Sequence, residues 1–303
     1  MIRAVCIGEC MVELRPAGER LFAQGFAGDS YNTAVYLQRS LGAEGETAFL
    51  TTIGDDPLSA ALRAEVRGQG LSDRLISEAP GLAPGLYVIE LGAGGERSFH
   101  YWRSTSAARR WWRDLRARGG AEALAGHDLV YLSGVSLAIL PGEERRQALR
   151  MLEDLRGEVA HLAFDPNLRP RLWDDPHDAR STIEHACALA SIVLPSRQDG
   201  ELLWGEHEVD AQLQRWRALG ADEVALTLGE DGVRLGWGGS EAHVPAPTAA
   251  TVDTSGAGDS FNGAYLAARL RGADPEPAAL AGVRLAAHVV GHPGAIAPPI
   301  PPA

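Results

Sequence analysis

Residues 253–266, which read DTSGAGDSFNGAYL, are the most informative stretch of this 303-residue chain. The small residues Gly256, Ala257 and Gly258 allow a tight turn that gathers backbone N–H groups at the start of a helix, where the helix dipole adds positive potential. Such a turn can hold a phosphate group. Asp259 follows directly, where its carboxylate can take a proton from a hydroxyl that attacks the phosphoryl group. The stretch therefore favours phosphoryl transfer over an ordinary capped helix.

Upstream of this stretch, strand and helix patterns alternate along the chain. The expected strands are 4–8, 48–53, 129–132, 161–164, 192–194, 223–228, 233–237 and 242–245, and the expected helices are 30–41, 58–68, 142–156, 176–189 and 209–219. Because most of these strands are apolar on both faces, the pattern predicts an α/β fold with a parallel sheet covered by helices on both sides. A chain of this length fits one large core over residues 1–303.

Two stretches, at about 11–28 and 85–104, depart from this alternation. They carry short period-2 segments, and residues 92–95, which are Gly-Ala-Gly-Gly, give a hairpin signal between two of them. We expect these insertions to form a small antiparallel sheet, a lid that stands apart from the main body. The Pro-rich residues 297–303 are expected to be a disordered tail.

Polar residues follow the predicted strands at their carboxyl ends. The segments are 8–9, 133–134, 165–167, 195–196 and 229–232. Ligands of open parallel sheets bind at this edge, so we expect the site there.

The composition excludes several classes of protein. Lys plus Arg number 28 against 40 Asp plus Glu, a net charge of -12, so no general cationic field exists for nucleic acid or an anionic membrane. The three cysteines, Cys6, Cys10 and Cys187, are too few for a disulfide framework, and no signal peptide or apolar run of 18 residues is visible. We therefore expect a cytoplasmic protein. A G-x-G-x-x-G motif after the first strand is missing, which argues against a dehydrogenase.

Residues 253–266 resemble the C-terminal signature of the PfkB, or ribokinase-like, sugar kinases. The resemblance implies a ribokinase-like α/β sandwich with a small β-sheet lid. It also implies that Asp259 is the catalytic base and that residues 256–258 form an anion hole. ATP and Mg²⁺ are the implied cosubstrate and metal, and the need for a monovalent cation is left open. The segment is not a Walker P-loop, since the Gly-Lys-Ser/Thr end is missing.

Residues 27–34, AGDSYNTA, resemble the sugar-binding turn of the same family, with Ser30 as a departure from the broad pattern. The resemblance implies that Gly28, Asp29 and Asn32 contact the sugar. The blocks GECM at 8–11, PGLY at 84–87, YWR at 101–103, YLSG at 131–134 and DPNLRP at 165–170 resemble the branch that phosphorylates the terminal hydroxyl of 2-keto-3-deoxygluconate.

A sugar acid needs a partner for its carboxylate. Arg103 and Arg169 are the candidates, because a guanidinium can bind a carboxylate through two hydrogen bonds. The alternative for each is a solvated surface ion pair. Tyr87 and Tyr101 are expected to bind ligand hydroxyls, with packing inside the lid as the alternative.

The resemblance also implies a nucleotide site. The turn at 228–232 resembles the one that lines the ATP cleft, and residues 291–295 resemble, more weakly, the segment near the adenine. The expected nucleotide contacts are Asn167, Ser196, Thr227, Gly229, Asp231, Gly232, Gly256 and Gly258. Residues 196–199, SRQD, stand in place of an Asn-x-x-Glu motif associated with Mg²⁺, so Asp199 is a candidate metal ligand.

Two other functions remain open from the sequence. One is a PfkB kinase of a neutral sugar such as fructose or ribose, and the other is a non-catalytic sugar-binding protein with the same fold. The exposed edges of a lid sheet also predict a homodimer or higher oligomer through the lid.

Overall fold

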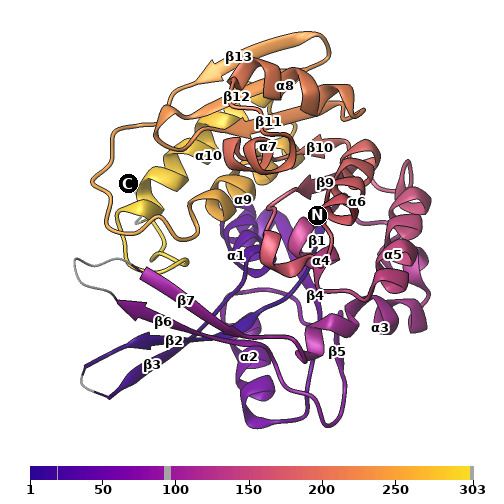
Figure 1. The fold of residues 1–303 in the computed structure, drawn as a ribbon, viewed down its shortest axis with the longest axis vertical. Coiled ribbons are helices and arrows are strands. Elements are labelled where there is room, and N and C mark those ends of the chain that lie inside the picture. The colour runs from indigo at the N-terminus through magenta and orange to yellow at the C-terminus, as the bar shows by residue number, and fades with distance from the viewer. Residues whose placement is uncertain (19, 92–96, 301–303) are drawn as a thin grey trace.

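The computed structural model describes residues 1–18, 20–91 and 97–300. Its body is a nine-stranded sheet in the order β13-β12-β11-β10-β9-β8-β1-β4-β5, with helices packed against it (Figure 1). The strands are β1 (Ile2–Ile7), β4 (Gly45–Ile53), β5 (Ile76–Glu78), β8 (Leu129–Ser133), β9 (His161–Asp165), β10 (Ile192–Val193), β11 (Glu223–Thr227), β12 (Val233–Trp237) and β13 (Ser240–Val244). The helices are α1 (Asp29–Leu41), α2 (Pro57–Gly68), α3 (Trp111–Ala117), α4 (Gly134–Ala138), α5 (Gly142–Leu155), α6 (Pro176–Leu189), α7 (Arg197–Trp204), α8 (Val209–Ala218), α9 (Ala257–Leu270) and α10 (Pro275–Val290).

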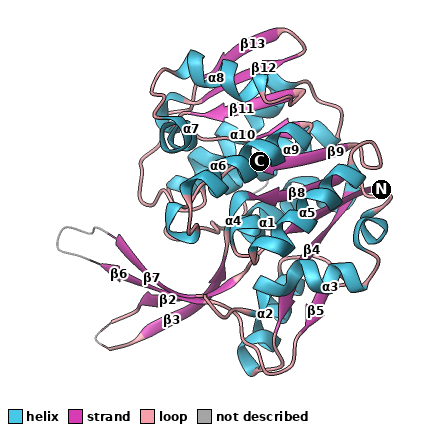
Figure 2. Cartoon of the chain, turned by 45° about the vertical axis from the view of Figure 1, so that its right-hand side comes forward, coloured by secondary structure: helices cyan, strands magenta, loops and turns pink. Residues whose placement is uncertain are grey.

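The body strands β5, β4, β1, β8, β9, β10 and β11 pair in parallel in this order, and β12 and β13 add an antiparallel edge. Successive side chains of β1 enter two separate cores. Val5 and Ile7 pack with residues of α3, α5, α6 and α8, whereas Ala4 and Cys6 pack with residues of α1, α2, α9 and α10. Helices therefore cover both faces, as Figure 2 shows, and the predicted α/β class is confirmed.

Four helices, α3, α4, α7 and α10, are not among the elements expected from the sequence. The longest of them, α10, is rich in alanine and carries few charges, so its apolar positions do not form one clear stripe. Its place is set by tertiary packing: Gly282 of α10 leaves room for the ring of Phe261 in α9, where a Cβ atom would lie 2.5 Å from Cδ2. Packing of this kind stabilises a helix even where the sequence lacks a clear amphipathic pattern.

The lid is a separate four-stranded sheet in the order β3-β2-β6-β7, and it projects from the body (Figures 1 and 2). Its strands are β2 (Met11–Pro16), β3 (Phe22–Ala27), β6 (Leu86–Leu91) and β7 (Arg97–Trp102). The expectation of an all-antiparallel sheet is wrong at its centre, because β2 and β6 pair in parallel. The chain returns to the body between β3 and β6 and re-enters the lid from the same side. The predicted turn at Gly92–Gly95 lies outside the described residues.

The C-terminal segment is ordered further than predicted. Ala297 is buried, its N–H donates to the Tyr36 hydroxyl at 2.8 Å, and its carbonyl accepts from Arg39 Nη1 at 2.7 Å. The carbonyl of Pro298 is 3.0 Å from His288 Nε2. Residues 297 and 298 of the predicted tail thus contact α1 and α10, and residues 301–303 lie outside the described part. Among the described helices, none has the length and apolar character needed to cross a membrane.

The close approach of α1 and α9 depends on Gly263. A Cβ atom at this position would lie 2.6 Å from the Cβ of Tyr36 and 2.7 Å from the backbone N of Leu37. We expect Gly263→Ala to lower the free energy of unfolding by about 2 kcal/mol, because the two helices must separate. Urea unfolding followed by circular dichroism measures this. Gly68→Ala in α2, where an added Cβ meets nothing within 4 Å, is the matched control; equal stability of the two variants would contradict the prediction.

Candidate active site

A cleft of about 1210 Å³ lies at the carboxyl ends of the parallel strands, beneath the lid. Most of the residues singled out from the sequence line it. They are Gly28, Asp29, Asn32, Tyr87, Tyr101, Arg103, Asn167, Arg169, Ser196, Asp199, Thr227, Gly256, Ala257, Gly258 and Asp259. The turn residues Gly229, Asp231 and Gly232 do not line this cleft, and Asp231 pairs with Arg197 Nη2 at 2.9 Å. The structure thus brings segments far apart in sequence to the predicted edge of the sheet.

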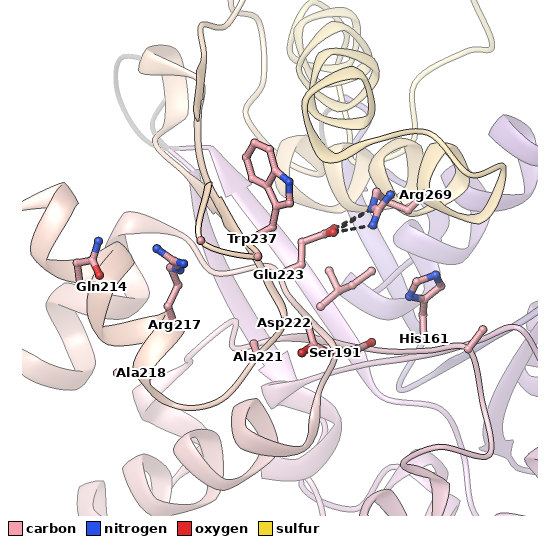
Figure 3. A pocket seen from close by; sticks show the side chains of 14 residues that line it. His161, Ser191, Gln214, Arg217, Ala218, Ala221, Asp222, Glu223, Trp237 and Arg269 are labelled. Atoms are coloured by element: carbon pink, nitrogen blue, oxygen red, sulfur yellow. Dashed lines mark hydrogen bonds and ion pairs between the residues drawn. The ribbon is translucent and has the colours of Figure 1, made fainter. Parts of the chain in front are cut away.

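A second cavity, of about 790 Å³, opens at the opposite edge, beside the first residues of β9, β10 and β11 (Figure 3). Its buried carboxylate, Glu223, accepts hydrogen bonds from Tyr265 Oη at 2.6 Å and from Arg269 Nε at 3.0 Å. These partners satisfy Glu223 within the protein. None of the residues predicted from the sequence lies in this cavity, so the cleft beneath the lid is the candidate active site.

The turn before α9 is built for close approach of backbone to a ligand. Gly256 has φ 75°, and a Cβ there would lie 2.2 Å from the carbonyl oxygen of Ala295, so only glycine fits. Asp253 holds the turn by accepting from the N–H groups of Ser255 at 3.0 Å and Gly294 at 2.5 Å. An added Cβ at Gly258 meets nothing within 4 Å. The start of α9 therefore faces open space, as an anion site requires.

Asp259 lies in the first turn of α9, and its Oδ2 accepts from Asn32 Nδ2 at 2.8 Å. Burial raises the pKa of this carboxyl to about 7, and the charge of Asp29 acts in the same direction. The hydrogen bond from Asn32 and the charge of Arg169 oppose that rise. A carboxyl with a pKa near neutrality is suited to general base catalysis.

Asp165, at the end of β9, links the sheet to two functional segments. Its Oδ1 accepts from the N–H of Asn167 at 3.0 Å, and its Oδ2 accepts from Asn262 Nδ2, one turn beyond Asp259, at 2.9 Å. Asn167 has φ 32° and donates from Nδ2 to Asp29 Oδ2 at 2.7 Å. Burial, and then the neighbouring aspartates, raise the pKa of Asp165 well above its ordinary value.

These contacts bear on the expectation that Asn167 touches the nucleotide. In the structure Asn167 fixes Asp29, a predicted sugar ligand. Sequence reasoning noted the Asp-Pro-Asn block but gave Asp165 and Asn262 no role. No local sequence pattern links Asp165 with Asn262, or Asn167 with Asp29, because the members of each pair lie far apart along the chain.

The Asp199 carboxylate accepts hydrogen bonds from Ser196, the N-cap residue of its own helix, α7. It accepts from Ser196 N at 2.8 Å and Ser196 Oγ at 2.6 Å, and from the N–H of Leu168 at 2.7 Å. Together Ser196 and Asp199 form a capping box at α7. The carboxylate is buried and both of its oxygens have donors, which gives it a structural role. No cluster of three or more His, Cys, Asp or Glu side chains suited to a metal ion occurs in the described part of the chain.

The arginines of the cleft differ in their partners. Arg103 forms an ion pair with the buried carboxylate of Glu9. Arg169 is exposed at the cleft and has no ion-pair partner within residues 1–18, 20–91 and 97–300. Arg171, which sequence reasoning missed, also lines the cleft. Both Arg169 and Arg171 oppose the burial-driven rise in the pKa of Tyr101, so all three arginines lie near that ring.

The two predicted tyrosines are not equivalent. Tyr87 is buried in the lid and its hydroxyl donates to Glu13. Tyr101 is 49% exposed, and its ring centroid lies 5.6 Å from that of Tyr87. Tyr101 therefore has the more accessible hydroxyl, whereas Tyr87 chiefly supports its ring.

Comparisons with known proteins agree with this geometry. Residues 1–302 match the model of the family described as pfkB family carbohydrate kinase. A 2-dehydro-3-deoxygluconokinase of Dickeya dadantii is 38% identical, and one of Escherichia coli K12 is 35% identical, each over 96% of both chains. The crystal structure of aminoimidazole riboside kinase from Salmonella enterica, complexed with aminoimidazole riboside and an ATP analogue, superposes with a TM-score of 0.82 at 25% identity, covering 97% of this chain and 94% of that one.

We expect the Asp259 carboxyl to titrate near pH 7 and to shift upward in Asn32→Ala, because that variant removes a hydrogen bond that favours the charged form. Carbon-13 NMR of labelled aspartate carboxyl groups measures both titrations, with Asp259→Asn used to assign the resonance. A pKa near 4 in the wild type, or a downward shift in Asn32→Ala, would contradict the prediction.

Proposed function

The chain belongs to the pfkB family of carbohydrate kinases, and from this premise we propose that it transfers the terminal phosphoryl group of ATP to the terminal hydroxyl of 2-keto-3-deoxygluconate, also called 2-dehydro-3-deoxygluconate. The product is 2-keto-3-deoxy-6-phosphogluconate. The observation that carries the proposal is the position of Asp259, at the start of α9 in a cleft that arginines border. The names of the relatives at 33–38% identity support the choice of sugar acid.

In this reaction Asp259 takes the proton of the attacking hydroxyl. The substrate oxygen forms a bond to the γ-phosphorus while the bond between that phosphorus and the bridging oxygen of ADP breaks. The raised pKa of Asp259 makes it a stronger base than an ordinary carboxylate, and it is still ionised above about pH 7. Asn32 holds the carboxylate in place at Oδ2.

The backbone N–H groups of residues 256–258 are the proposed anion hole for the transferred phosphoryl group. The open space beside Gly258 supports this role. ATP is proposed to bind with Mg²⁺, which would neutralise phosphate charge and would be held mostly by phosphate oxygens and water. Asn167, Ser196, Thr227, Gly229, Asp231 and Gly232 remain predicted nucleotide contacts.

The sugar acid is proposed to lie between the lid and Asp29. Arg169 and Arg103 bind its carboxylate, while Gly28, Asp29 and Asn32 on α1 and its preceding turn, with Tyr101, contact hydroxyls. Arg169 has no ion-pair partner among the described residues, which supports this role, since a neutral ligand gives a guanidinium no anionic partner. For the same reason a fructose or ribose kinase is the less favoured alternative.

A homodimer, or a larger homo-oligomer, through the lid sheet is proposed as the assembled form. Strands β3 and β7 are the free edges of this sheet, and Trp102 and Phe22 on them are 62% and 53% exposed. Edge strands and exposed aromatic side chains favour pairing with another copy.

We place the enzyme in the cytoplasm, where its three free cysteines stay reduced.

An ADP-release assay with MgATP tests the proposed activity against four acceptors: 2-keto-3-deoxygluconate, its galacto epimer, fructose and ribose. We expect turnover with the keto-deoxy acids alone, and a loss of roughly 10²- to 10⁴-fold in kcat for Asp259→Asn. Asp154→Asn, on an exposed position of α5, is the control. Turnover with fructose or ribose alone would refute the substrate, and none with any acceptor would favour a binding protein.

Arg169→Ala tests recognition of the carboxylate. We expect KM for the sugar acid to rise roughly 10- to 100-fold with a small change in KM for ATP, because the loss removes a charge-assisted hydrogen bond. Arg150→Ala, at an exposed arginine remote from the cleft, controls for the loss of surface charge. An equal rise in KM for the acid and for a neutral ketose would contradict the assigned role.

A further inference from the structure

Four segments join the lid to the body, and all of them meet at Glu9. Glu9 itself lies between β1 and β2. Gly28 lies between β3 and α1, and a Cβ there would be 2.1 Å from the carbonyl oxygen of Glu9. Gly85 precedes β6, and its Cβ would be 2.7 Å from Glu9 Oε1. Arg103 follows β7 and donates from Nη2 to Glu9 Oε2. The junction of lid and body is therefore packed around one acidic side chain.

The ion pair at this junction is only partly satisfied. The side chain of Glu9 is 1% exposed and that of Arg103 is 13% exposed. Glu9 Oε1 and Arg103 Nε are both buried without a hydrogen-bond partner among the described residues. A buried pair with unused hydrogen-bonding atoms is costly compared with two apolar residues. Stability alone therefore gives little reason for its presence.

The position of Arg103 suggests what the pair does. Glu9, Arg103 and Tyr101 all line the cleft. The guanidinium carbon of Arg103 lies 5.9 Å from the centroid of the Tyr101 ring. One nitrogen is engaged by Glu9, while a guanidinium has five N–H donors in a fixed plane. The Arg103 guanidinium is thus held by Glu9 on one side and by the Tyr101 ring on another. Together these contacts fix the plane of the guanidinium and the direction of its remaining N–H groups.

We propose that Glu9 is a positioning residue for recognition of the substrate carboxylate. It anchors Arg103 so that the free N–H groups of the guanidinium are presented to the cleft in a fixed orientation. Recognition of a carboxylate through two hydrogen bonds depends on that orientation, which a mobile side chain loses. Glu9 acts through Arg103 and does not itself touch the reacting atoms. The inference rests on the proposed function and assigns Glu9, the second residue after β1, a part in its substrate specificity.

Two substitutions at Glu9 separate orientation from charge. Glu9→Ala removes the anchor, and we expect KM for the sugar acid to rise about tenfold, with kcat and KM for ATP within about twofold of wild type. Glu9→Gln keeps an acceptor oxygen for Arg103, so we expect it to stay within about threefold of wild type. In an Arg103→Ala background, Glu9→Ala should add nothing further, because the residue it positions is gone.

Glu223→Ala is the matched control, since Glu223 is also a buried carboxylate paired with an arginine, at the opposite edge of the sheet. It should lower the unfolding midpoint without changing KM for the sugar acid. If Glu9→Ala does not fold, Glu9→Asp, which withdraws the carboxylate by one methylene, replaces it and should also raise that KM. An unchanged or lowered KM, or an additive effect on Arg103→Ala, would overturn the inference. A wild-type enzyme inactive on the sugar acid would instead refute the proposed function.

Discussion

Negative charge confined at the carboxyl edge of the sheet is the constraint on which this site depends. Four aspartates line the cleft there, Asp29, Asp165, Asp199 and Asp259, in addition to the carboxylates of Glu9 and Glu13. Burial raises the pKa of Asp165, Asp199 and Asp259, and the charges of neighbouring aspartates add to the rise at Asp165 and Asp259. All four aspartates accept hydrogen bonds from neutral donors. The side chains of Asn167, Asn262 and Asn32 donate to Asp29, Asp165 and Asp259, respectively, and the Ser196 hydroxyl and the Leu168 N–H donate to Asp199. Amides and hydroxyls fix a carboxylate without cancelling its charge, which an arginine would do. Asp259 therefore stays basic enough to take a proton.

The cations of the cleft are arranged on the other side. The charges of Arg103, Arg169 and Arg171 all oppose the rise in the pKa of Tyr101 in the lid. Of these three, only Arg169 also opposes the rise in the pKa of Asp259. The aspartates of the site thus lie toward α9 and its arginines lie near Tyr101 of the lid, where Glu9 and Glu13 also line the cleft. A ligand with a carboxylate at one end and a hydroxyl at the other is oriented by this division before any specific contact forms. In the proposed reaction, this orientation of the two ends brings the substrate hydroxyl to Asp259.

The elements that the sequence could predict are those specified by local pattern. Apolar runs marked strands such as β8 and β9, and the signature at Gly256–Asp259 marked the start of α9 correctly. Three features could not be predicted. The parallel pairing of β2 with β6 depends on the path of the chain through the body. The pairing of Arg103 with Glu9 joins residues 94 apart in sequence. The burial of Ala297 depends on Tyr36 and Arg39 of α1, which no local pattern of the tail encodes.

The same chain path explains why the lid is well placed to hold a substrate. A hairpin inserted once would meet the body at two points, but this sheet is inserted in two pieces and meets it at four. All four lie around Glu9 and Arg103, so the pair fixes the base of the sheet that carries Tyr87 and Tyr101. Tertiary packing around a single buried charge resists tilting of the sheet, because any tilt leaves that charge without its partner. The junction therefore fixes the position of Arg103 and Tyr101, the proposed contacts of the sugar acid, relative to Asp259.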